Sequence, residues 1–127
     1  KINNTISLIL ENLKLEMKDC FVMGFSQGGI MAFELGRSIK SQLAGVGIIS
    51  SRIIKKDDTP NSIFQKTPIF ISHGAQDDVL PISNFNQSIN ILKKDNFNFE
   101  SHLIEKDRHT MSPDTIKLFQ NFIKKNI

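Results

Sequence analysis

Short continuous apolar runs alternate along this chain with longer stretches of helical periodicity. The apolar runs are typical of buried strands and occupy residues 20–25, 44–50 and 68–73, followed by an alternating fourth segment at 97–105. Helical patterns fill residues 3–17, 27–39, 82–94 and the stretch that begins at Ser112. Strands that alternate with helices in this way predict an α/β fold, in which helices flank a mostly parallel sheet.

Capping and turn residues mark the ends of these elements. Ser112 followed by Pro113 is typical of a helix N-terminus, and Ser83 is placed to cap the helix at 82–94. Pro68 stands at the first position of its strand, where a missing N–H is tolerated. Residues 52–66 are polar and irregular, with a short turn expected near Ile63.

The composition limits the class of protein. A chain of 127 residues, 39% hydrophobic and 23% charged, is expected to fold as one globular domain over residues 1–127. The net charge of +3 comes with scattered lysines and no basic stripe, which argues against nucleic-acid binding. No apolar stretch is long enough to span a bilayer. The one cysteine, Cys20, is expected to be a small buried side chain, and a chain without an internal disulfide suits the cytoplasm.

A serine stands between glycines where the first apolar run meets a helix. Gly24-Phe25-Ser26-Gln27-Gly28 fits G-x-S-x-G, in which the serine projects from a sharp strand-to-helix turn. Glycines are expected two residues before and after the serine because side chains there would collide. The helix behind the serine would direct its first N–H groups at a developing oxyanion. The alternative is a glycine-rich turn with a solvated serine.

A nucleophile of this kind requires an acid and then a histidine later in the chain. Asp77 and Asp78 both follow the strand at 68–73, and His109 follows the segment at 97–105. Because carboxyl ends of parallel strands share one edge of the sheet, these residues are expected on the same edge as Ser26.

The remaining histidines fit other roles. His73, at the end of a strand, is expected to be buried or hydrogen-bonded and to shape the aspartate loop, whereas His102 is expected at the surface or in packing. No His, Cys and Asp cluster has metal-ligand spacing, and no glycine-rich nucleotide motif occurs. The sequence therefore predicts neither a metal nor another cofactor.

Three features together resemble the carboxylesterase/phospholipase family of the α/β-hydrolase superfamily, which includes the acyl-protein thioesterases. They are the stretch GFSQGG, the stretch HGAQDDVLP and the late His109. The aspartate loop matches the family pattern HG-x-x-D-x-(V/L)-(V/L)-P, which selects Asp77 over Asp78. The resemblance covers nearly the whole chain and implies an α/β-hydrolase-like sheet. It also implies a serine hydrolase that acts on small acyl esters, thioesters or lysophospholipids without a cofactor.

The resemblance also implies a role for each residue. Ser26 would attack the acyl carbonyl, His109 would take and return the proton, and Asp77 would hold the imidazole in the required tautomer. The backbone N–H of Gln27 would donate one hydrogen bond in the oxyanion hole.

The sequence departs from the family in several places. Arg108 and Thr110 flank the histidine where the family usually has Gly and Ser. Ser50-Ser51 and an atypical RIIKKDD segment follow the second strand, where the family often has Ser-Gly. The family also carries an N-terminal segment that holds the first strands of the sheet and the loop giving the second oxyanion donor. We expect those N-terminal strands to be missing here, so that residues 1–127 form a single partial domain.

Without those strands, residues 20–25 would form an exposed apolar edge of the sheet, which is a template for another chain. We expect either an N-terminal complementary fragment or a second copy, in a homodimer, to cover it. Two interpretations follow for the chain: an active ester hydrolase, or a non-catalytic C-terminal fragment or assembly module that needs a missing N-terminal part.

Overall fold

Four strands form one sheet in the order in which they occur along the chain. The computed structural model describes residues 2–56 and 61–127. The strands are β1 (Phe21–Phe25), β2 (Gly45–Ile49), β3 (Ile69–Gly74) and β4 (Phe99–Ile104), in the order β1-β2-β3-β4. All three neighbouring pairs are parallel, which confirms the α/β class expected from the sequence.

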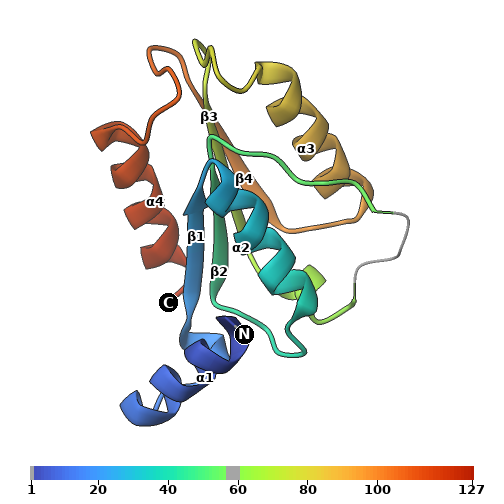
Figure 1. Cartoon of the computed structure of the whole chain (residues 1–127), viewed down its shortest axis with the longest axis vertical. Helices are drawn as coiled ribbons and strands as arrows, with labels where there is room; N and C mark the ends of the chain where they lie inside the picture. The colour runs from blue at the N-terminus through green and yellow to red at the C-terminus, as the bar shows by residue number, and fades with distance from the viewer. Residues whose placement is uncertain (1, 57–60) are drawn as a thin grey trace.

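Helices lie on both faces of this sheet (Figure 1). Their bounds are α1 (Ile2–Leu13), α2 (Gln27–Ser38), α3 (Ile82–Lys94) and α4 (Pro113–Lys125), with short 3-10 turns η1 (Met17–Asp19) and η2 (Phe64–Lys66). Figure 1 shows α2 and α3 on one face, α4 on the other, and α1 near the amino end of β1.

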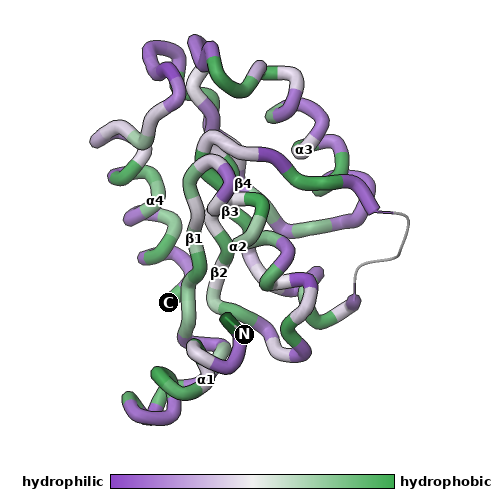
Figure 2. Tube along the Cα trace, in the orientation of Figure 1, coloured by the Kyte–Doolittle hydropathy of each residue, from purple (hydrophilic) through white to green (hydrophobic). Residues whose placement is uncertain are grey.

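Each face of the sheet has its own apolar core. On the α2 and α3 side, Phe33, Phe64 and Phe97 pack ring against ring with centroids 5.0–5.6 Å apart. On the α4 side, Phe119 and Phe122 pack against the central strands. Figure 2 shows the apolar residues concentrated along the strands, where burial on both faces favours β-branched and aromatic side chains.

The last helix begins as expected from its capping residues. The Ser112 Oγ accepts a hydrogen bond from the Thr115 N–H at 3.3 Å, and Pro113 occupies the first helical position. The expectation for Ser83 is wrong. Helix α3 has Pro81 as its N-cap, so Ser83 lies inside the first turn and caps nothing.

Two element boundaries differ from the sequence expectation for identifiable reasons. Helix α1 ends at Leu13 because Lys14 adopts a φ of 57° and the Leu15 N–H bonds back to the Leu10 carbonyl, which closes the helix. Met17 therefore belongs to η1 and not to the first helix. Strand β4 begins two residues after Phe97, because that ring turns into the core beneath α2.

The outer strands are less buried than the sequence suggested. β2 and β3 are buried at every position, but Met23 and Phe25 of β1 remain 39% and 37% exposed. The physical reason is position, since β1 pairs only with β2 among the described residues. Cys20, just before β1, is accordingly half-buried, not buried. Within residues 2–56 and 61–127, no helix combines the length and apolarity needed to cross a bilayer.

Candidate active site

Ser26 occupies a strained turn between β1 and α2. Its φ of 55° and ψ of −122° lie where side-chain-bearing residues rarely occur, and α2 begins at the next residue, Gln27. Its own N–H bonds to the Ile49 carbonyl of β2 at 2.9 Å, which fixes the turn to the neighbouring strand. Backbone strain of this kind costs of order 1–3 kcal/mol and occurs most often at functional sites.

The glycines around this turn do not have equal steric roles. A Cβ on Gly24 would lie 1.9 Å from the Gly28 carbonyl oxygen, and one on Gly29 would lie 2.5 Å from the Ser51 Cβ. A Cβ on Gly28 would meet no heavy atom within 4 Å. The collision expected at position 28 is therefore wrong within this chain, because a Cβ on Gly28 would point into open space although the Gly28 backbone lies against Gly24. The steric requirement falls on Gly24 and Gly29.

We expect Gly24→Ala to destabilise the protein by more than about 3 kcal/mol, because the strand and helix backbones would have to separate. The matched change Gly28→Ala is expected to be tolerated and to stabilise α2 by up to about 1 kcal/mol, through helix propensity. Urea unfolding followed by circular dichroism measures both. Equal destabilisation by the two variants would contradict this steric account.

The structure brings Ser26, His109 and Asp77 into one chain of hydrogen bonds. The His109 Nε2 lies 3.1 Å from the Ser26 Oγ, and its Nδ1 lies 2.7 Å from the Asp77 Oδ2. The three residues come from turns after β1, β4 and β3, at the shared carboxyl edge of the sheet. With a carboxylate on Nδ1, the imidazole carries its proton there and presents a lone pair on Nε2 to the serine.

Asp77 is the buried acid of the aspartate loop, whereas Asp78 is exposed. The Asp77 Oδ1 accepts hydrogen bonds from the Val79 and Leu80 N–H groups at 2.9 and 2.7 Å. Burial alone would raise the pKa of Asp77, but these bonds and His109 together hold the pKa below its ordinary value. The stabilisation from the ionised carboxylate is therefore complete at neutral pH and is lost only as the pH falls through this lowered pKa.

His73 supports the aspartate loop from inside the sheet. Its side chain is fully buried, its Nε2 donates to the Leu80 carbonyl at 2.8 Å, and the same nitrogen lies 3.4 Å from the Asp77 Oδ2. The Leu80 N–H in turn bonds to Asp77, so His73 fixes the residue that holds the carboxylate. This confirms the expectation that His73 is buried and shapes the loop.

The loop that carries His109 is held by contacts that the sequence did not indicate. A Cβ on Gly74 would lie 2.3 Å from the Arg108 carbonyl oxygen, so this glycine lets the loop approach β3, while the Arg108 residue itself is exposed. The Ser50 Oγ donates to the Thr110 carbonyl at 3.1 Å. The Phe25 ring packs against the imidazole with centroids 5.0 Å apart. Phe25 is part of the serine motif, and this proximity to Ser26 was the feature of the sequence that could have indicated the contact.

The Gln27 backbone N–H lies directly behind the serine. As the first residue of α2, Gln27 has an N–H without an intrahelical acceptor, and the positive end of the helix dipole lies there. It is therefore available to the oxyanion of an acyl group that the Ser26 Oγ has attacked.

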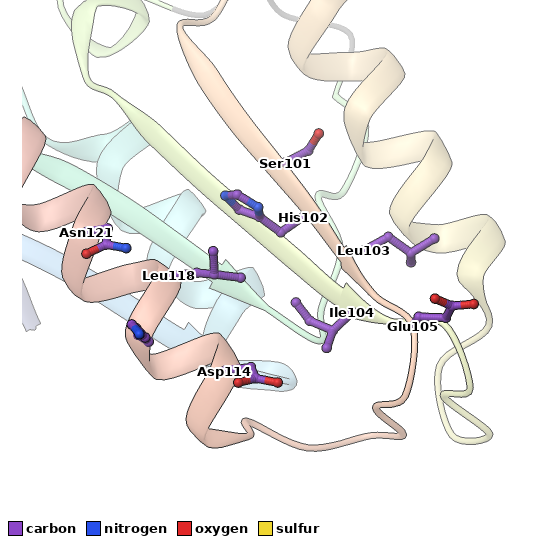
Figure 3. Close-up of a pocket in the computed structure, with 9 residues that line it drawn as sticks. Ser101, His102, Leu103, Ile104, Glu105, Asp114, Leu118 and Asn121 are labelled. Carbon is purple, nitrogen blue, oxygen red and sulfur yellow. The ribbon is translucent and has the colours of Figure 1, made fainter.

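His102 lies apart from these residues, as expected from its position within a strand. Its Nε2 bonds to the Glu100 Oε2 at 2.7 Å, and its ring packs 5.3 Å from that of Phe70. It faces a surface hollow of about 570 Å³ between β4 and α4 (Figure 3). None of Ser26, Asp77 and His109 lines this hollow.

The sequence model of one family, described as Phospholipase/Carboxylesterase, matches residues 1–127. Acyl-protein thioesterase 1 of Emericella nidulans is 35% identical over 82 residues, covering 59% of this chain and 34% of that protein. Acyl-protein thioesterase 1 of Saccharomyces cerevisiae is 27% identical over 142 aligned positions, covering 98% of this chain and 60% of that protein.

The fold also matches solved structures. The crystal structure of Arabidopsis thaliana SOBER1 superposes with a TM-score of 0.86 at 21% identity, covering 98% of this chain and 62% of that chain. The chain thus spans 34% to 62% of the length of these three proteins.

Proposed function

Because the chain belongs to the phospholipase/carboxylesterase family, we propose that it supplies the catalytic residues of a cytoplasmic serine hydrolase. The substrates are carboxylic esters or thioesters of small acyl groups, lysophospholipids included, and hydrolysis proceeds through an acyl-enzyme. Residues 1–127 are proposed to be one partial α/β-hydrolase domain.

Each residue of the site has a step in the proposed reaction. The Ser26 Oγ attacks the acyl carbonyl while His109 Nε2 takes the hydroxyl proton, and the Gln27 N–H stabilises the oxyanion. When the tetrahedral intermediate collapses, the protonated His109 gives that proton to the departing alkoxide or thiolate. A water molecule, deprotonated by the same imidazole, then attacks the acyl-serine, and the imidazolium returns the proton to the Ser26 Oγ as the carboxylic acid is released. Asp77 stabilises the imidazolium at both stages.

The observation that carries this proposal is the pair of distances from His109 to Ser26 and Asp77, 3.1 and 2.7 Å. The test is hydrolysis of short p-nitrophenyl esters and of an acyl thioester, with chelator present. Both substrates are expected to be hydrolysed with the chelator present, because each step of the proposed reaction is assigned to a protein group. Hydrolysis that the chelator abolishes would rule out this assignment.

The alternative is a non-catalytic C-terminal fragment or assembly module that needs a further N-terminal part. The family supplies its second oxyanion donor from such a part, so we expect the chain alone to hydrolyse esters poorly. Loss of one oxyanion donor typically costs about 100- to 1,000-fold in rate. A fluorophosphonate distinguishes the two interpretations, because labelling requires an activated serine even where turnover is slow.

The free edge of β1 leads to a further proposal about assembly. Met23 and Phe25 are exposed on this strand, and Leu8 and Leu13 of α1 are more than 60% exposed nearby in the chain. An unpaired apolar edge of this kind is a template for another strand. We propose that either an N-terminal complementary fragment or a second copy of the chain covers it.

In sedimentation at micromolar concentration, we expect the chain alone to associate, most simply as a symmetric dimer with antiparallel β1 strands. Met23→Lys should shift the population toward monomer, because a lysine on an edge strand opposes pairing. The control is Val79→Lys, which changes an exposed apolar residue of the aspartate loop. A wild-type monomer whose β1 remains open to water would contradict the proposal.

A further inference from the structure

A groove of about 400 Å³ runs between residues 52–55 and helix α3. Its apolar floor consists of Ile53, Ile54 and Ile91, of which Ile53 is buried and Ile54 is 40% exposed. In Figure 1 this segment leaves the carboxyl end of β2 and runs beside α3.

The walls of the groove are fixed to each other. The Ile53 N–H donates to the Ser88 Oγ at 2.8 Å, and the Ser88 hydroxyl donates to the Asn84 carbonyl at 2.8 Å. Ser88 is fully buried, so the segment is anchored to the helix at its centre. This side of the groove is therefore fixed to the helix.

Three cations line the groove: Arg52, Lys55 and Lys94. None of them forms an ion pair with a described residue, whereas the neighbouring Lys56 pairs with Glu34 at 2.9 Å. Among the described residues, Asp95 is the one acid that lines the adjoining hollow. Of the residues that the structure describes, three cations and no acid line the groove above an apolar floor, which complements a ligand with carboxylates and aliphatic groups.

The α3 wall adds a row of side-chain amides. Asn84, Gln87 and Asn90 line the groove. Gln87 and Asn90 are exposed, and their side-chain amides form no hydrogen bond with another described residue. An amide offers both a donor and an acceptor, as an extended peptide backbone requires. An aliphatic lipid chain would leave these amides without partners, and a flat bilayer surface cannot enter a concave groove.

We propose that this groove binds an extended acidic peptide segment of a partner protein. Its carboxylates would lie against Lys55 and Lys94, its backbone against the amide row, and an aliphatic side chain on the isoleucine floor. The groove begins beside the candidate active site, since Ser50, two residues before Arg52, bonds to the residue that follows His109. Binding itself does not require Ser26.

The test is fluorescence anisotropy with a labelled peptide of alternating acidic and aliphatic residues, titrated with the whole chain. We expect a Kd of about 10–100 µM, the range of weak peptide docking, that rises with salt above about 0.1 M. A matched peptide in which Gln and Asn replace Glu and Asp is expected to bind at least about 10-fold more weakly.

Lys94→Glu is expected to weaken peptide binding about 10-fold, because a partner of the carboxylates becomes a repelling charge. Lys93→Glu is the matched control, since Lys93 is in the same last turn of α3 but does not line the groove. Ile54→Ser tests the floor at an exposed position and should weaken binding about three-fold. Circular dichroism melting confirms that each variant is folded.

Two results would overturn the proposal. One is equal weakening by Lys93→Glu and Lys94→Glu, which would indicate general charge attraction. The other is binding to phosphatidylserine vesicles that Lys94→Glu abolishes, together with no binding of the peptide, which would assign the surface to lipid. Peptide binding that is retained in Ser26→Ala and weakened by Lys94→Glu would support the groove as a peptide site. This result would hold even if the proposed hydrolase function fails.

Discussion

Ser26→Ala is expected to lower ester hydrolysis by at least about 1,000-fold and to abolish labelling by a fluorophosphonate. The substitution removes the hydroxyl that lies 3.1 Å from the His109 Nε2, and no other nucleophile of the proposed site replaces it. Hydrolysis should be measured where the wild-type chain turns over, alone or with an N-terminal part. Labelling is read from intact mass.

The control for this prediction is Ser41→Ala, which removes an exposed hydroxyl in the connection between α2 and β2. It should leave hydrolysis and labelling within about two-fold of wild type, as expected for a surface change away from the site. Persistent labelling of Ser26→Ala would show that another residue is the nucleophile.

Asp77→Asn is expected to lower the rate by about 10,000-fold with little change in the fold. The asparagine oxygen can still accept the Val79 and Leu80 N–H groups, but its NH₂ would then face the His109 Nδ1. An NH₂ donor there favours the tautomer with its proton on Nε2, which cannot take the serine proton.

The neighbouring Asp78 provides a matched control. Asp78→Asn makes the same chemical change on an exposed residue one position along the loop, so activity should remain within about two-fold of wild type. If Asp78→Asn were the more damaging change, the acid of the proposed triad would have to be reassigned.

The order of helices and strands could be predicted from the spacing of apolar residues, because each element has a strong local pattern. Helix α3 occupies the residues expected, 82–94, since Phe85, Ser88 and Leu92 are buried at helical spacing. The ends of helices and strands that depend on tertiary packing could not be predicted from local periodicity. The sequence pattern predicted that Phe97 is part of a strand, but its ring belongs to the aromatic cluster with Phe33 and Phe64.

Motif spacing indicated Ser26, His109 and the aspartate loop, because a parallel sheet brings the turns after β1, β3 and β4 to one edge. The choice of Asp77 over Asp78 came from the resemblance to the family. Supporting contacts could not be foreseen in the same way. Ser50 reaches Thr110 across 60 positions of sequence, and the Gly74 contact depends on how the His109 loop folds back. Gly28 is the opposite case. The motif predicted a steric need for glycine at this position, but a Cβ on Gly28 would meet no heavy atom within 4 Å.

In the proposed reaction, Ser26 is a nucleophile activated by His109 and Asp77. The most direct test of this role is peptide mapping by tandem mass spectrometry after reaction with a fluorophosphonate, with the β1 edge covered by an N-terminal part. We expect a single adduct, located on Ser26 and lost when the protein is unfolded before labelling. An adduct on any other residue, or none on folded protein, would contradict it.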